Sequence, residues 1–360
     1  MPRKGGAAMK DYAFHLANTS EMRRLPERFH ICPQCGRREY KVYVNDKCEP
    51  IHESVGRCNR EVRCAYHLPP KEWFRMNPQD KEDYLKRAAN APKREPLKMV
   101  EIQREVVLEC FKKERREKNT LFGFLVQAGI EEKKLLEKWA MYCIGTTQPH
   151  GNTIWWQIDE DGRIRSGKIM QYFPNGSRKD NEGKPGYTNW IHAILGKAGQ
   201  INLNTHGYVG CMFGQHLLAA TTPEAVPNVN IVESEKSALM ASVYGREDEI
   251  WLAVGSITSM NIHTLNPIIR QGRNIMLYPD HDGYERWKQK AEEIKKQYPK
   301  ICVSDYVERA WQPGMKPTAD IADIILHRLK ESPQARLERM RRENPAIDNL
   351  ISELQLEPIV

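Results

Sequence analysis

The chain has 360 residues, 40% of them hydrophobic and 28% charged, and its formal net charge is +8. This composition is typical of a soluble, folded protein with room for two or three domains, and it contains no apolar run of the roughly 18 residues that a membrane span needs. The basic start of the chain lacks the apolar core of a signal peptide, so we expect a cytoplasmic protein. In a reducing compartment, the nine cysteines favour metal binding or burial over disulfide bonds.

Positive charge is concentrated at the N-terminal end. Residues 1–100 contain 21 Lys and Arg against 13 Asp and Glu, a net charge of +8, so the rest of the chain is neutral overall. A basic segment of this kind indicates a polyanionic partner, and the alternative is an ordinary solvated surface.

Four cysteines in this segment have the spacing of a zinc site. Cys32 and Cys35 form a tight Cys-x2-Cys knuckle before Gly36, and Cys58 and Cys64 follow as a looser pair. Four thiolates complete a tetrahedral Zn²⁺ site, and so small a module has little core without a metal. Between the pairs, residues 40–44 alternate like a strand, so we predict a zinc ribbon within residues 1–90. The alternatives are free buried cysteines or a ligand set that includes Cys48, His52 or His67.

Aromatic residues accompany the arginines of this segment. Tyr66, Trp73 and Phe74 either stack on the bases of single-stranded nucleic acid or form the core of the ribbon. Residues 88–98, with two prolines, indicate a linker, and residues 101–117 have the apolar periodicity of one helix.

The middle of the chain predicts two helices and a hairpin. Residues 121–130 read as a helix closed by a glycine, and residues 131–142 as a second helix. Residues 153–158 and 163–172 read as strands joined by a turn. Because Trp155 and Trp156 are adjacent in a strand, they point to opposite faces, and we expect one of them in the core.

Carboxylates follow two apolar strands in the C-terminal half. Glu233 follows residues 229–232, and Asp280 and Asp282 follow residues 275–278. In a parallel α/β sheet the carboxyl ends of the strands meet at one edge. Three carboxylates placed so closely repel one another unless a hard cation lies among them. The pattern therefore predicts a Mg²⁺ or Mn²⁺ site that serves phosphoryl transfer.

This pattern resembles the toprim domain of bacterial primases, topoisomerases and some nucleases. That family has a Glu after one strand and Asp-x-Asp after a later one, with a strand like residues 250–256 between them and, in some primases, a closing stretch like residues 316–323. The family has Gly where this chain has Ser234, a change of little cost unless positive φ is needed there. The resemblance implies an α/β fold in which a mostly parallel sheet is flanked by helices.

The order of the modules is similar to that of bacterial-type DNA primases. The layout is a zinc ribbon (1–90), a mixed α+β subdomain of helices and a hairpin (99–225), a toprim catalytic domain (226–330) and a polar helical tail (331–360), so the chain resembles a compact phage or mobile-element member. In the family, basic residues of the middle subdomain hold phosphates. Carried over, these are Arg163, Arg165, Lys168 and Lys179, although surface charge explains any one of them equally well.

The resemblance implies DNA-templated primer synthesis by Mg²⁺-dependent nucleotidyl transfer. Glu233, Asp280 and Asp282 would hold the metal, with Glu233 also a candidate general base, while Asp320 and Asp323 would hold a second metal or act structurally. Lys236 would neutralise phosphate or pair with Glu235. The implied partners are a single-stranded DNA template, nucleoside triphosphates and a replicative helicase. A toprim nuclease and a non-catalytic DNA-binding protein remain alternatives.

Overall fold

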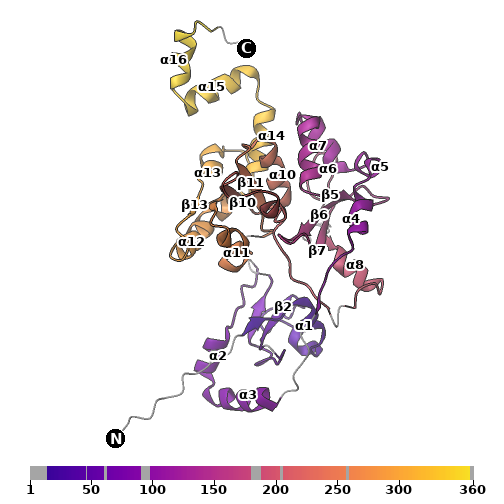
Figure 1. Cartoon of the computed structure of the whole chain (residues 1–360). Helices are drawn as coiled ribbons and strands as arrows, with labels where there is room; N and C mark the ends of the chain where they lie inside the picture. The colour runs from indigo at the N-terminus through magenta and orange to yellow at the C-terminus, as the bar shows by residue number, and fades with distance from the viewer. Residues whose placement is uncertain are drawn as a thin grey trace. The chain divides into compact units, whose positions relative to one another are not determined.

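The structure is a computed structural model that describes residues 14–45, 47–60, 63–90, 98–179, 188–202, 206–256 and 259–356 (Figure 1). The chain divides into two compact units. The N-terminal unit comprises Met1–Val100 and Ile194–Val209, and the main unit comprises Glu101–Ala193 and Gly210–Val360. The basic start of the chain and most of the predicted linker lie outside the described residues.

The N-terminal unit is built on a small antiparallel sheet. Its order is β1 (His15–Leu16), β2 (Tyr40–Val44) and β3 (Gly56–Cys58), and β2 occupies the residues predicted for it. Alternate side chains of β2 are buried, as expected for a strand with one face on a core. The other elements are the helices α1 (Thr19–Arg23), η1 (Glu27–His30), α2 (Pro70–Met76) and α3 (Pro78–Asn90), and the parallel pair β4 (Lys98–Met99) and β9 (His206–Gly207).

The aromatic residues of this unit are core residues. Tyr66 packs against the cluster that contains Cys32 and Cys58, and Trp73 and Phe74 pack against a second cluster around Ile51, Val55 and Tyr84. Of the two interpretations of these aromatics, the structure therefore supports the core.

An antiparallel sheet forms one half of the main unit. Its order is β5 (Ile144–Thr146), β6 (Thr153–Ile158), β7 (Ile164–Met170) and β8 (Thr188–Trp190), so the predicted hairpin is confirmed. The expectation for the tryptophan pair was wrong, because Trp155 and Trp156 are both fully buried. Trp155 meets Phe213 edge-on at 5.3 Å between ring centroids. Trp156 lies on the opposite face beside Gly145 and Gly167, where the nearby atoms include those of Cys110, the last residue of α4 (Arg104–Cys110), and Ile191, the first residue of α8 (Ile191–Lys197).

The helices before this sheet differ from the prediction at one place. The expected helix over 101–117 is broken into α4 and α5 (Lys113–Arg116). The first helix, α4, begins later than residue 101 because the backbone at Ile102 is extended. The Ile102 N–H donates to the carbonyl of Ile164 on β7 at 2.8 Å. Lys112, with ψ 140°, then interrupts the helical backbone. Both following helices are confirmed, as α6 (Thr120–Gln127) and α7 (Glu132–Met141).

A four-stranded parallel sheet forms the other half of the main unit. Its order is β11 (Glu249–Ala253), β10 (Asn228–Val232), β12 (Asn274–Leu277) and β13 (Ile301–Val303), which confirms the predicted parallel α/β arrangement. The connecting helices are α10 (Glu235–Tyr244), α11 (Ile262–Arg270), η2 (His281–Gly283) and α12 (Tyr284–Lys295), and α13 (Tyr306–Ala310) and α14 (Ile321–Leu329) follow the last strand.

Both sheets of the main unit share one hydrophobic core. Tyr142, which follows α7, stacks on Phe213 and donates its hydroxyl proton to the carbonyl of Trp251 on β11 at 2.7 Å. The short helix α9 (Leu217–Ala220) contributes two buried leucines to the same core. The predicted helical tail is present as α15 (Pro333–Glu343) and α16 (Ala346–Glu353). Across the described ranges, no helix has the length and apolar character required to cross a bilayer.

Candidate functional site

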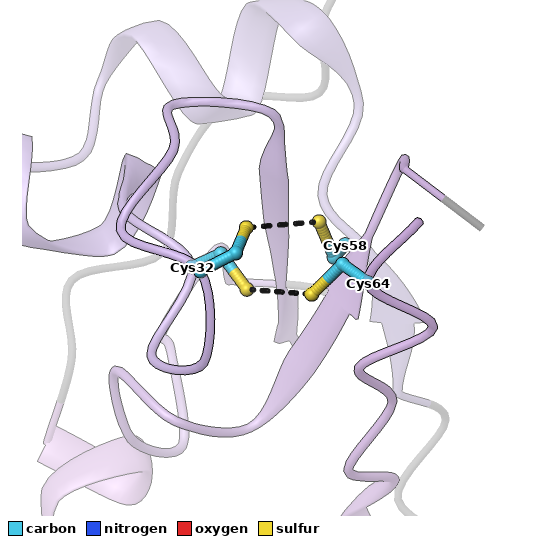
Figure 2. Close-up of side chains that lie close together, drawn as sticks. Cys32, Cys58 and Cys64 are labelled. Carbon is cyan, nitrogen blue, oxygen red and sulfur yellow. Dashed lines mark hydrogen bonds between the residues drawn. The ribbon is translucent and has the colours of Figure 1, made fainter. Parts of the chain in front are cut away.

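The four predicted cysteines of the N-terminal unit come together. The Sγ atoms of Cys32 and Cys64 are 3.7 Å apart, those of Cys35 and Cys58 are 3.9 Å apart, and all four lie within 4.8 Å of one another (Figure 2). Cys32 and Cys35 lie on a tight turn that Gly36 closes with φ +64°, and Cys58 ends β3. Four sulfur donors at this separation suit tetrahedral zinc.

The competing ligands are engaged elsewhere. Cys48 donates its thiol proton to Glu21 at 3.3 Å, the His67 ring lies 3.0 Å from the Tyr43 hydroxyl, and the His52 ring stacks on Trp73 at 4.4 Å between centroids. A hydrogen bond from the backbone of Arg37 lowers the pKa of Cys35 to about 7, whereas burial raises the pKa of Cys58 to about 12, so Cys35 is the thiol that forms a thiolate more readily. The observed cluster is the ligand set that the cysteine spacing predicted.

The acidic residues of the main unit gather at the carboxyl edge of the parallel sheet. Glu233 directly follows β10, and its carbonyl accepts the Gly255 N–H after β11 at 2.8 Å. Asp280 and Asp282 follow β12, which is paired with β10 at Ile231 and Leu277. The His281 N–H donates to the carbonyl of Ala319 at 2.9 Å, which brings this loop beside Asp320.

Asp280 lies at the electrostatic centre of this edge. Burial is the largest cause that raises its pKa, and the charges of Asp320, Glu233, Asp282 and Asp323 raise it further, to about 9. Burial and the charge of Asp320 also raise the pKa of Asp323. Among the described residues, the buried Oδ1 atom of Asp280 has no hydrogen-bond partner. A buried oxygen without a donor, surrounded by carboxylates, matches the chemistry of a hard divalent cation.

These carboxylates are less tightly gathered than the cysteines. Among the residues that the structure describes, the four cysteines form the one group of metal-ligating side chains whose donor atoms all lie within 4.8 Å of one another. The acidic edge therefore suits a divalent cation in charge and donor type, whereas the cysteine site suits its metal in geometry as well.

Asp320 and Asp323 have a structural role at the start of α14. The Asp320 side chain accepts a hydrogen bond from the Asp323 N–H at 2.9 Å, and the Asp323 side chain accepts one from the Asp320 N–H at 3.4 Å. The two residues therefore form a capping box. The buried Ser237 hydroxyl of α10 donates to Asp320 Oδ2 at 2.5 Å. Ser234 caps α10 by accepting the Ser237 N–H, at φ −100°, so serine is unstrained where the resemblance has glycine.

The predicted phosphate contacts of the hairpin are held by acidic partners within the main unit. Arg163 and Arg165 both bind the Asp159 carboxylate, at 3.1 and 2.8 Å. Lys168 on β7 donates to the buried Glu235 at 3.0 Å, which joins the antiparallel sheet to the first turn of α10.

Two further predicted contacts lie elsewhere in the main unit. Lys179 lies over the Phe173 ring at 5.3 Å. Lys236 does not pair with Glu235, which Lys168 occupies, and among the described residues it has no ion-pair partner. Its charge lowers the pKa of Asp323, partly offsetting the burial that raises it.

Sequence reasoning missed the residues that support the acidic edge. Ser237 and Glu235 lie within the motif around Glu233, but their partners are distant in the sequence. His281, between the two aspartates, binds Glu308 through Nδ1 at 2.8 Å and stacks on Trp311 at 4.6 Å between ring centroids. No periodicity or spacing in the sequence signals these pairs, because each joins separate elements.

Two family models match parts of the chain. Residues 12–79 match the zinc beta-ribbon finger family, which, with the four-cysteine cluster, confirms the predicted zinc ribbon. Residues 119–281 match a domain of unknown function (DUF6371). No curated protein matches the chain in sequence.

Several solved structures of primases are similar to this chain. The primase fragment of the bacteriophage T7 primase-helicase protein is 14% identical, with a TM-score of 0.37 over 86% of this chain and 98% of that one. The E. coli primase catalytic core is also 14% identical, with a TM-score of 0.37 over 64% and 77% of the two chains. The Aquifex aeolicus primase, comprising its zinc-binding and RNA polymerase domains, is 12% identical, with a TM-score of 0.32 over 85% and 79%. Because these TM-scores are low, the function proposed below rests on the residues of this chain.

Proposed function

We propose that the protein is a DNA-templated primer synthase whose catalytic edge has the toprim arrangement. The observation that carries the proposal is the set of carboxylates around Asp280 at the carboxyl ends of neighbouring parallel strands. The ordered motif around Glu233, Asp280 and Asp282 supports it, as does a zinc ribbon in a strongly basic N-terminal segment.

In this proposal, Glu233, Asp280 and Asp282 hold Mg²⁺ or Mn²⁺, which when bound supplies charge neutralisation for nucleotide phosphates. The remaining residues prepare that edge. Ser237 and the capping box orient Asp320 and Asp323, and the buried Lys168–Glu235 ion pair holds α10, which begins just after Glu233, against β7. Glu233 is the candidate general base, because it follows the strand directly beside Asp280.

The basic groups have two proposed roles. Lys236 and Lys179, which have no carboxylate partner among the described residues, are the candidates for phosphate contacts. Arg163, Arg165 and Lys168 could bind phosphate only if it displaced their present acidic partners. We therefore assign them first to positioning the elements that they join. The ribbon unit, with its excess of positive charge, would bind the single-stranded template.

The test is incubation of the full-length protein with single-stranded DNA, Mg²⁺ or Mn²⁺ and labelled nucleoside triphosphates. We expect labelled oligonucleotides from the wild type and none from Asp280→Asn. Asp305→Asn is the matched control, because Asp305 is an exposed partner of Arg309 outside the acidic edge, and it should retain synthesis.

Two other results would replace the proposal. Shortened DNA without labelled product would make the protein a nuclease that uses the same carboxylates. If the assay gives neither labelled oligonucleotides nor shortened DNA, the result would favour a non-catalytic DNA-binding protein, which is the second candidate. That candidate is supported by the wider spacing of the acidic donors compared with the cysteines.

A further inference from the structure

An open groove of about 620 Å³ lies in the main unit beside the acidic edge. One wall is α6 with Phe124, another is the turn at Pro174 and Asn175, and the third is the loop at Lys316 together with α14. All of these elements belong to the main unit, so the groove is complete within one body.

Phe124 gives the groove an aromatic surface in a fixed position. The ring packs directly on Gly176, which has φ +74° and where any Cβ would overlap the ring. Gly176 closes the turn that carries Pro174 and Asn175, so the turn and the ring hold each other in place. On the same turn, Phe173 leaves 42% of its surface exposed beneath the Lys179 ammonium group.

Cationic groups line the opposite wall. Asp323, Leu326 and His327 of α14 and its C-cap residue Lys330 are spaced three and four residues apart, so they share one face of the helix, and all four line the groove. Lys316 lies on the adjoining loop. Within the described ranges, Lys316 and Lys330 have no ion-pair partner, and both are exposed. Two exposed lysines and an aromatic ring that line one groove favour a ligand that carries both phosphate and base.

The groove also leads to the acidic edge. Asp323 lines the groove and forms the capping box with Asp320, and the carbonyl of Ala319 accepts the N–H of His281 between Asp280 and Asp282 at 2.9 Å. A strand in the groove would therefore pass directly beside the carboxylates to which we assign catalysis.

We propose that this groove binds a single strand of nucleic acid, with its phosphates on Lys316 and Lys330 and a base against Phe124. The proposal rests on the proposed function in one respect, namely that a bound strand would lead to the catalytic carboxylates. It adds a binding surface that the sequence motifs do not contain. Base–aromatic stacking and unpaired lysines together are the chemistry of sequence-tolerant single-strand binding. A free nucleoside triphosphate has the same two groups, so the experiment must separate the two ligands.

The test measures binding of fluorescein-labelled oligothymidylate to the full-length, zinc-loaded protein by anisotropy, without divalent metal and over a range of salt concentrations. The variant is Lys316→Ala/Lys330→Ala. Its matched control is Lys133→Ala/Lys296→Ala, in which two exposed lysines outside the groove, also without ion-pair partners among the described residues, are removed. For two lost phosphate contacts on a single strand, the slope of log K against log salt should become shallower by about 1.4, with a loss of roughly tenfold in affinity at 0.15 M salt.

A second measurement does not depend on the variants folding. Oligonucleotides containing 5-iodouracil are photocross-linked to the wild-type protein, and the modified peptides are identified by mass spectrometry. We expect cross-links at Phe124 or Phe173. Equal salt slopes for the groove and control variants, or cross-links that avoid both phenylalanines, would overturn the proposal.

Binding of a labelled nucleoside triphosphate to the groove variant decides whether the groove binds a nucleic-acid strand or a free nucleotide. If the groove variant loses binding of a labelled nucleoside triphosphate but keeps wild-type binding of the oligonucleotide, the groove is a nucleotide site and the proposal is wrong. Because these measurements involve no turnover, they are independent of the proposed function. Loss of synthesis in Asp280→Asn with unchanged oligonucleotide binding supports both, whereas strand binding in a protein that makes no product refutes only the proposed function.

Discussion

Asp280→Asn should stabilise the protein in the absence of divalent metal. The folded state raises the pKa of Asp280 from 3.8 to about 9. At pH 7 the folded protein therefore keeps this carboxyl protonated, although the unfolded chain releases the proton. At about 1.4 kcal/mol per pH unit, the difference costs the fold on the order of 4 kcal/mol. An amide is neutral at all of these pH values, so Asn removes this cost.

The sign of the effect fixes its pH dependence. Because the folded pKa lies above the unfolded value, the wild-type protein loses stability as the pH rises from about 4 to about 9. The free energy of unfolding of the variant lacks this loss, so the gap between the two proteins should be small near pH 4. It should then widen by about 1.4 kcal/mol per pH unit toward pH 9. Relaxation around the site will lower the total, and we expect a gain of roughly 2–4 kcal/mol at pH 7.

The assay is urea denaturation at pH 5, 7 and 9, with zinc retained and divalent magnesium and manganese omitted. Asp282→Asn serves as a graded control, because Asp282 is exposed and acts on the edge mainly through its charge on Asp280, so its gain should be smaller. Added Mg²⁺ should stabilise the wild type and not Asp280→Asn. The reasoning is refuted if Asp280→Asn is less stable than the wild type at pH 7 without metal, or if the gap does not change with pH.

Three further predictions concern the zinc site, the basic segment and the buried ion pair. Purified, reduced protein should contain about one zinc per chain, and Cys32→Ser/Cys35→Ser should release it while the main unit keeps its unfolding transition; freshly purified wild type without zinc by elemental analysis would contradict this. Deletion of residues 1–90 should weaken binding of single-stranded DNA and make its salt dependence shallower, and an unchanged salt slope would argue against the ribbon as a template contact. Lys168→Met should destabilise the main unit by about 3 kcal/mol, because it leaves Glu235 buried and unpaired. The double variant Lys168→Met/Glu235→Gln should recover most of that loss. If Lys168→Met and the wild type are equally stable in urea, Lys168 is again a candidate for phosphate contact.

Local sequence patterns determined the zinc ribbon and the elements around both sites. The Cys-x2-Cys knuckle and the second cysteine pair predicted the cluster, because short turns fix how close such side chains can come. The apolar runs before Glu233 and Asp280 predicted β10 and β12, since buried parallel strands are recognisable as short hydrophobic segments bounded by turns. The hairpin and the two helices before it followed from the same kind of local signal.

The electrostatic state of the acidic edge required the tertiary structure. The sequence placed Glu233, Asp280 and Asp282 at the ends of strands, but only the packing shows that the Oδ1 atom of Asp280 is buried and that Asp320 and Asp323 form a capping box. Burial depends on what other segments cover a residue, and that information is spread over the whole chain.

Pairings between distant segments explain the remaining differences. Lys168 and Glu235 are 67 residues apart, and each has ordinary surface chemistry in its own segment, so no local pattern predicts that they form a buried ion pair. The same holds for Trp155 and Trp156, which a two-residue alternation assigns to opposite faces of a sheet. That assignment holds, but a strand pattern does not reveal whether helices cover both faces. Here Cys110 and Ile191 lie on the second face near Trp156, and both tryptophans are buried. Sequence periodicity reports the direction of a side chain, whereas its partner and its exposure are set by the elements that pack against it.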